Sequence, residues 1–170
     1  MSNKITSAVS SLKKQFNAFE LPLDLDNLVE KAGIQIKYVD NPDTSGFAYQ
    51  KSGVKYIGVN STESYVRQRF TIAHELGHIY LHRQDPLRYD PSVEFVYYRD
   101  GKSAAGTDQK EIEANAFAAE LLMPEEAVKK EIKSMNGIDL HDSDAVERLA
   151  NKFGVSQAAI TVRLGKLYGY

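Results

Sequence analysis

Three of the four histidines in the sequence lie in one stretch, AHELGHIYLH, at positions 73–82. On an α-helix, residues four apart share a face and lie about 6 Å apart along the axis, so His74 and His78 can bind one metal ion. Glu75 lies about 100° round the helix from His74, which keeps its carboxylate off the metal but within reach of a bound water. This spacing predicts a zinc site with Glu75 as general base. The alternative is a buried helix whose histidines form hydrogen bonds in the core.

The other two histidines are not predicted to be ligands. His82 follows His74 by eight residues, so on a straight helix the two lie about 12 Å apart along the axis, too far for metal–nitrogen bonds of about 2 Å. The longer signature H-E-x-x-H-x-x-G-x-x-H also fails, because Leu81 and Gln84 replace its glycine and last histidine. We expect His82 to form hydrogen bonds or cap the helix, and His141 to lie at the surface in a polar turn. The third ligand must come from another element.

The strongest candidate for the third ligand is Glu111, at the start of the stretch EIEANAFAAELLMP. Glu111 and Asn115 are four apart on a predicted helix, so one face carries a carboxylate and an amide that can hydrogen-bond to it or to a neighbouring ligand. Glu113 points to the opposite side, about 200° away from Glu111. The alternative is that Glu111 forms a helix-capping arrangement with Asp108.

Hydrophobic periodicity and turn signals predict the elements that position these residues. The predicted helices cover 5–16, 25–32, 65–82, 108–122 and 124–136, and two more flank Gly154, with Ser143 and Ser156 as their N-caps. The predicted strands cover 34–39, 46–49 and 54–59, with a hairpin turn at 51–53, and VEFVYY is a possible edge strand in a long loop. These elements predict an α+β fold with a small antiparallel sheet and a central helix that carries the histidines. We expect residues 1–125 to form the core and residues 126–170 a helical segment packed on it.

Composition narrows the classes of protein. The 170 residues are 42% hydrophobic and 26% charged, as in globular proteins, and contain no cysteine, so a metal must be held by nitrogen and oxygen ligands. The net charge of -2 gives no electrostatic argument for nucleic acid as the main ligand. The amino terminus lacks a signal-peptide core and no run is long enough to span a membrane, so we expect a cytoplasmic protein.

Several blocks of the sequence resemble the ImmA/IrrE family of metallopeptidases, in the same order and over most of the chain. The blocks are SGFAY, IGVN, RQRFTIAHELGHIYLH, EIEANAFAAELLMP and LANKFGVSQAAITVRL. The resemblance implies a zincin-like fold of the gluzincin kind. It also implies that His74, His78 and Glu111 bind zinc and that Glu75 is the catalytic base.

The resemblance implies a regulatory function as well. Members of the family look like proteases that cleave a helix-turn-helix repressor and so release the genes of a mobile element or a stress response. Longer relatives carry a further carboxyl-terminal sensory domain, so this chain looks like the compact anti-repressor type of integrative elements and prophages. The expected partner is a repressor encoded nearby. The oxyanion donor is left open among Tyr97, Tyr98, Arg67 and Arg69.

Two other functions are considered. One is a partner-binding protein of a toxin–antitoxin or repressor pair that does not cut its partner. The other is a DNA-binding regulator that uses the helix-turn-helix-like carboxyl-terminal helices. Their basic residues Arg148, Lys152, Arg163 and Lys166 are partly offset by Asp144 and Glu147, and a phosphate-binding surface normally carries a denser set of basic residues.

Overall fold

The computed structural model describes residues 3–41, 43–82, 95–97 and 109–169, which form an α+β fold. The helices are α1 (Asn3–Phe16), α2 (Leu25–Lys31), α3 (Tyr65–Leu81), α4 (Gln109–Leu122), α5 (Glu125–Ser134), α6 (Ser143–Phe153) and α7 (Gln157–Tyr168). The strands are β1 (Ile34–Val39), β2 (Gly46–Lys51), β3 (Val54–Asn60) and β4 (Phe95–Tyr97). Within the described ranges, no helix is both long and apolar enough to cross a membrane.

The four strands form one sheet in the order β1-β3-β2-β4. β2 pairs antiparallel with β3, as the predicted hairpin requires. β4 is the described part of the predicted edge strand, and it pairs antiparallel with β2. The prediction of an antiparallel sheet is wrong for the remaining pair, because β1 and β3 run parallel. The β2–β3 hairpin folds back so that β3 lies between β1 and β2, and the sheet is therefore mixed.

Local side-chain chemistry explains where several elements begin and turn. Asp24 caps α2 by accepting a hydrogen bond from the Asn27 amide, and Ser156 caps α7 by accepting one from the Ala159 amide. Both residues of the β2–β3 turn have positive φ angles, as the right-handed twist of a hairpin favours. The predicted cap of α6 is wrong by one residue, because Asp142 and not Ser143 accepts its first amide hydrogen bonds.

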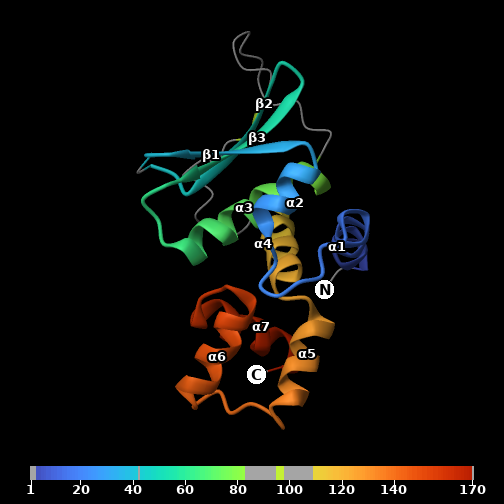
Figure 1. Cartoon of the computed structure of the whole chain (residues 1–170), viewed down its shortest axis with the longest axis vertical. Helices are drawn as coiled ribbons and strands as arrows, with labels where there is room; N and C mark the ends of the chain where they lie inside the picture. Colours follow the sequence, from blue (N-terminus) through green and yellow to red (C-terminus); the bar gives the residue numbers. More distant parts are fainter. Residues whose placement is uncertain (1–2, 42, 83–94, 98–108, 170) are drawn as a thin grey trace.

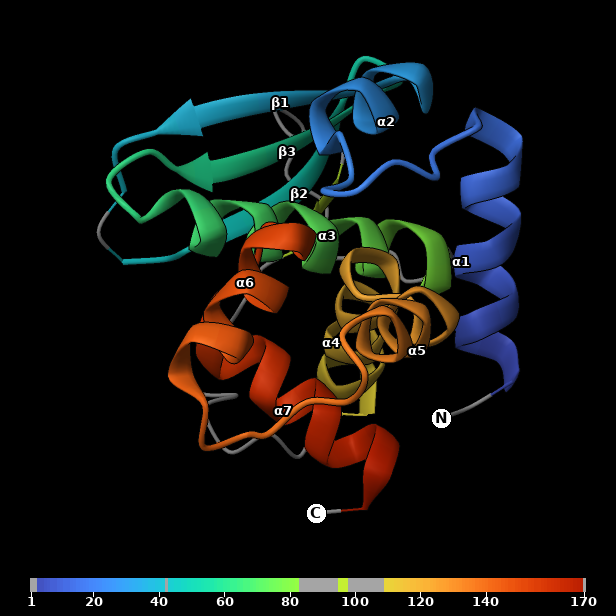
Figure 2. The same ribbon diagram turned by 60° about the horizontal axis from the view of Figure 1, so that its bottom comes forward.

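The elements form two tiers joined by α4 (Figure 1). The sheet, α2 and α3 make up one tier, and α5, α6 and α7 the other. Figure 2 shows α3 running along the sheet, where it contacts β2 and β3, with α4 packed beside it. Most α3 residues between Arg69 and Ile79 are buried, so this is the central helix that the sequence predicts.

Two buried arginines tie the carboxyl-terminal helices to the rest of the protein. Arg69 of α3 donates hydrogen bonds to the carbonyl oxygens of Leu23, at 2.8 Å, and Gly154, at 3.0 Å. Arg163 of α7 donates to the carbonyl oxygen of Met123 and forms a buried ion pair with Glu120 of α4. The α6–α7 pair is therefore held against α3 and α4 by polar contacts in addition to its apolar core.

Candidate metal centre

The close packing of α3 on α4 brings the predicted ligands together. A Cβ atom added to Gly77 would lie 3.0 Å from the Cα atom and 3.2 Å from the carbonyl oxygen of Ala114. A glycine is therefore needed at this position for the two backbones to approach as they do. His74 and His78 precede and follow Gly77 on α3, and Glu111 precedes Ala114 on α4, so this contact sets the distance between the ligand helices.

Three predicted ligands converge on one point between these helices. The Nε2 atoms of His74 and His78 are 3.0 Å apart. The Glu111 carboxylate lies 3.3 Å from His74 Nε2 through one oxygen and 3.1 Å from His78 Nε2 through the other. Among the described residues, these three side chains form a group whose ligand atoms could hold a metal ion.

The donor set and its dimensions fit zinc. Zinc–nitrogen and zinc–oxygen bonds of about 2.0–2.1 Å at tetrahedral angles place neighbouring ligand atoms about 3.3 Å apart. The three observed separations lie at or slightly below that value. Two imidazoles and one carboxylate are also the protein ligands of a catalytic zinc site, which leaves a fourth position open.

Asn115 orients the first of these histidines. The Nδ1 atom of His74 is 3.0 Å from the side-chain oxygen of Asn115, one helical turn after Glu111. When Nδ1–H donates to this oxygen, the Nε2 lone pair of His74 is available to a metal and points toward His78 and Glu111. The predicted amide partner on the Glu111 face of α4 therefore contacts His74, one of the predicted ligands.

Glu75 follows His74 on α3 and is buried, with 3% of its surface exposed. It lies where α3 meets the start of β2: a Cβ atom added to Gly46 would lie 2.3 Å from Thr71 Cγ2 and 3.8 Å from Glu75 Cγ. Glycine at position 46 lets the strand approach α3 at the level of the predicted base. The sequence reasoning missed the roles of Gly46 and Gly77, although a glycine inside a helical pattern is a known sign of close packing.

The remaining histidines lie outside the three-residue group. His82 is the C-cap of α3, and its Nε2–H donates to the Lys110 carbonyl oxygen at 3.3 Å. Glu113, on a different side of α4 from Glu111, lies 4.0 Å from His82. His141 is exposed, as predicted. His82 therefore links the end of α3 to the start of α4.

The structure reduces the set of candidate oxyanion donors. The buried guanidinium of Arg69 donates to the Leu23 and Gly154 carbonyl oxygens, so these structural hydrogen bonds already occupy it. Arg67 donates to Ser45 Oγ at 3.0 Å and lies 3.7 Å from a Glu63 carboxylate oxygen. Tyr97 ends β4, and Tyr98 lies outside the described residues, as does Asp108, the proposed capping partner of Glu111.

Comparison with known proteins adds to this geometry. The model of the Peptidase M78 family, described as the IrrE N-terminal-like domain, matches residues 29–165. The chain belongs to this family, the ImmA/IrrE family. It is a peptidase family whose members are generally zinc-dependent. The matched range includes α3 and α4 and extends through α6 into α7, so the family domain contains the carboxyl-terminal helices.

One sequence relative and one solved structure are similar to this ImmA/IrrE chain. The chain is 32% identical over 101 residues to "Uncharacterized immunity region protein 2" of Bacillus phage phi105. The aligned region covers 54% of this chain and 58% of that protein. The chain thus spans little more than half the length of this curated relative. A solved structure titled "Mycobacterium tuberculosis transcriptional regulator" superposes with a TM-score of 0.64 at 19% identity, over 96% of this chain and 47% of the other. The second likeness shows a shared fold.

Proposed function

We propose that this chain is a zinc-dependent endopeptidase that cleaves a helix-turn-helix transcriptional repressor at a specific site. The observation that carries the proposal is the convergence of His74, His78 and Glu111 on one point, with the buried residue Glu75 next to His74 on α3. Two imidazoles, a carboxylate and an adjacent general base are the groups that peptide hydrolysis by a gluzincin requires. We propose the same three side chains as the zinc ligands.

The roles of the chain's own residues in hydrolysis follow from their positions. Zinc, when bound, would act as a Lewis acid and lower the pKa of water. Glu75 would take a proton from the attacking water at its carboxylate and pass it to the nitrogen of the leaving amine. Asn115 would keep the His74 ring oriented with Nε2 toward the metal. The buried position of Glu75 would strengthen its interaction with the developing charges, because screening by water is weak there.

The proposed substrate class rests on the phage relative. The relative is named for a phage immunity region, and this name fits a peptidase that inactivates a repressor and so derepresses a mobile element or a stress regulon. The repressor would be encoded near this chain, and both would act in the cytoplasm. We further propose that residues 1–125 form the peptidase core and residues 126–170 a helical segment that contributes to recognition.

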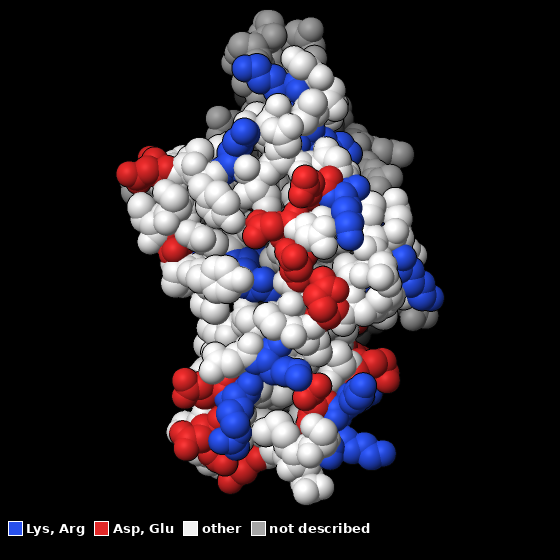
Figure 3. All heavy atoms as spheres, viewed as in Figure 1, with Lys and Arg blue, Asp and Glu red and all other residues white. Residues whose placement is uncertain are grey.

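The contacts of α7 argue against DNA as the direct ligand. Arg163, one of the basic residues of the helix-turn-helix-like segment, has 1% of its side chain exposed and is paired with Glu120. It is therefore withheld from a phosphate backbone. On the face shown in Figure 3, acidic and basic side chains are interspersed over the tier that contains α5, α6 and α7. A continuous basic surface, which phosphate binding requires, is not seen on that face.

The test is a comparison of the wild-type protein with Glu75→Gln. Both are loaded with zinc and incubated with the purified repressor encoded beside the chain, and products are identified by intact-mass spectrometry. We expect the wild type to cut the repressor at one site, while Glu75→Gln binds it but cuts at least about a hundredfold more slowly. If neither protein cuts and both bind equally, the chain is a partner-binding protein and the proposal is wrong.

A further inference from the structure

A groove of about 640 Å³ runs beside the candidate metal centre, between α3, α4 and α7. This volume is in the range of sites that hold small ligands or several side chains. Its described walls are largely apolar and include Phe70, Ala119, Met123, Val155, Ala159 and Val162. Val162 has 59% of its surface exposed, an unusual degree for a large apolar side chain on a helix.

The groove is continuous with the candidate metal centre. Phe70 and His74 are one turn apart on α3, and their rings lie 6.4 Å apart. On α4, Glu111, Asn115 and Ala119 follow one another at intervals of four and so share a face. Asn115 both lines the groove and contacts His74. A polypeptide that leaves the metal centre along the seam between α3 and α4 therefore enters the groove.

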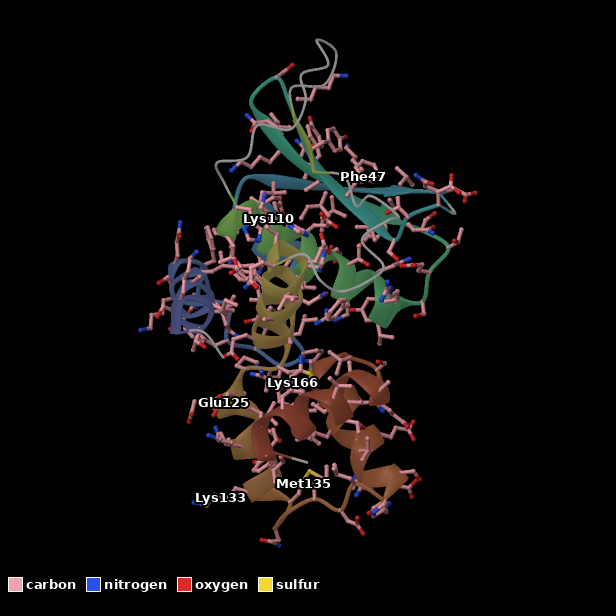
Figure 4. The ribbon with its side chains drawn as sticks, turned by 180° about the vertical axis from the view of Figure 1, so that it is seen from behind. Phe47, Lys110, Glu125, Lys133, Met135 and Lys166 are labelled. Atoms are coloured by element: carbon pink, nitrogen blue, oxygen red, sulfur yellow. The ribbon has the colours of Figure 1, made fainter. Side chains whose placement is uncertain are left out.

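Figure 4 shows the two ends of this path. Lys110 lies at the start of α4, beside α3, and Lys166 lies among the carboxyl-terminal helices near the other end of α4. Since α7 forms the third wall, the buried Arg163–Glu120 pair that fixes α7 to α4 also fixes the width of the groove. The carboxyl-terminal helices thus shape a surface that begins at the ligands.

The charges of the groove have one sign. The charged side chains among its described lining residues are Arg67, Arg163 and Lys166, all basic. Arg163 is neutralised by Glu120, and Arg67 lies 3.7 Å from Glu63. Lys166 is exposed and forms no ion pair within the described ranges. The far end of the groove therefore presents a positive charge next to an apolar surface.

We propose that this groove binds the part of the substrate polypeptide that adjoins the scissile bond. Large apolar side chains would pack between Phe70, Met123 and Val162, and an acidic side chain a few residues further along would face Lys166. This inference rests on the proposed endopeptidase function and specifies the sequence that the enzyme prefers. Helix α7 is then a specificity element of the peptidase.

The experiment uses a synthetic library of randomised dodecapeptides and the full-length, zinc-loaded chain. Mass spectrometry of the products is expected to show large apolar residues enriched at one fixed position beside the cleaved bond, with acidic residues enriched beyond it. Ala159→Trp, which fills the groove, should lower kcat/KM for the preferred peptides by at least about tenfold. Lys166→Glu should shift the preference from acidic toward basic peptides by about fivefold.

Lys133→Glu is the matched control. It makes the same charge change on an exposed residue of α5, and Figure 4 shows Lys133 far from the α3–α4 seam. Its cleavage preference should equal that of the wild type. If the wild type cuts peptides but Ala159→Trp and Lys166→Glu keep its preference and rate, the groove does not bind substrate and the inference is overturned.

A failure of the proposed function gives a different result. In that case, the wild type and Glu75→Gln leave every peptide uncut. Capture of library peptides on immobilised Glu75→Gln then tests whether the groove binds peptides, independently of any cleavage. The inference is supported if Glu75→Gln retains peptides with apolar and acidic residues and the double variant Glu75→Gln with Ala159→Trp loses them. Equal retention by both variants, or no enrichment of such peptides, overturns the inference.

Discussion

The Nδ1 atom of His74 lies 3.0 Å from the side-chain oxygen of Asn115, so an α4 residue orients the ring of a predicted ligand on α3. This contact links the two helices directly at the candidate metal centre. It lies next to the point where the predicted ligands His74 and His78 of α3 meet Glu111 of α4. Because Asn115 also lines the groove, the proposed substrate-binding surface and the orientation of the His74 ring share one side chain.

The His74–Asn115 contact predicts that Asn115→Ala lowers the affinity for zinc by about 10- to 100-fold, because the ring loses its hydrogen-bond acceptor. Asn115→Asp keeps an acceptor and should bind zinc at least as tightly as the wild type. Competition with a chromophoric chelator measures both affinities. Equal affinities of the wild type and Asn115→Ala would show that this hydrogen bond does not orient the ligand.

The Gly77–Ala114 contact predicts that Gly77→Ala weakens zinc binding more than it weakens the fold. The added methyl group moves α4 by a few tenths of an ångström and costs about 1–3 kcal/mol as overpacking, but alanine favours the helix over glycine by about 1 kcal/mol. Calorimetry of the zinc-free protein and zinc titration separate the two effects. A wild-type zinc affinity in Gly77→Ala would contradict the inferred role of this contact.

The buried Arg163–Glu120 pair predicts a large stability loss when one partner is removed. Arg163→Met should lower the free energy of unfolding by about 3–5 kcal/mol, because the Glu120 carboxylate is left buried without its arginine. Replacing both, Glu120→Leu with Arg163→Met, should recover much of the loss. Lys129→Met, which breaks the exposed pair with Glu125, is the control and should leave the urea midpoint unchanged. Equal effects of Arg163→Met and Lys129→Met would contradict this prediction.

Burial lowers the pKa of Lys13, with the carboxylates of Glu20 and Glu120 opposing the shift. The folded state therefore releases the Lys13 proton at a lower pH than the unfolded state. Between this lowered pKa and the ordinary value of 10.5, the unfolded chain binds more protons, so this residue makes stability rise with pH. The stability of the wild type relative to Lys13→Met should increase across that window. The exposed neighbour Lys14, changed to Met, should show no such trend in urea titrations at each pH.

The parts of the structure that depend on residues close together in the sequence could be predicted from it. The caps at Asp24 and Ser156 and the turn at Ser52-Gly53 follow from short-range hydrogen bonding and backbone preference. The shared face of His74 and His78 follows from the helical repeat. The sequence predicts Glu111 as the strongest candidate for the third member of this group. The packing of α3 on α4 brings Glu111 beside the two histidines.

The parts that depend on long-range packing could not be predicted in this way. Periodicity identifies strands but not their neighbours, and so the parallel pairing of β1 with β3 was missed. The Arg163–Glu120 pair joins residues 43 positions apart, and the Arg69–Gly154 hydrogen bond joins residues 85 positions apart. No local signal marks such contacts. The groove shared by α3, α4 and α7 depends on both of them.

Removal and return of zinc, with the repressor as substrate, tests the central claim most directly. The chain is stripped with a chelator, dialysed, and assayed by intact-mass spectrometry before and after addition of one equivalent of zinc. We predict that the stripped protein leaves the repressor intact, and that zinc restores its conversion to two fragments whose masses sum to that of the repressor plus one water. Cleavage at the same rate by the stripped protein, or by zinc-loaded Glu75→Gln, would contradict the assignment of this site as the centre of peptide hydrolysis.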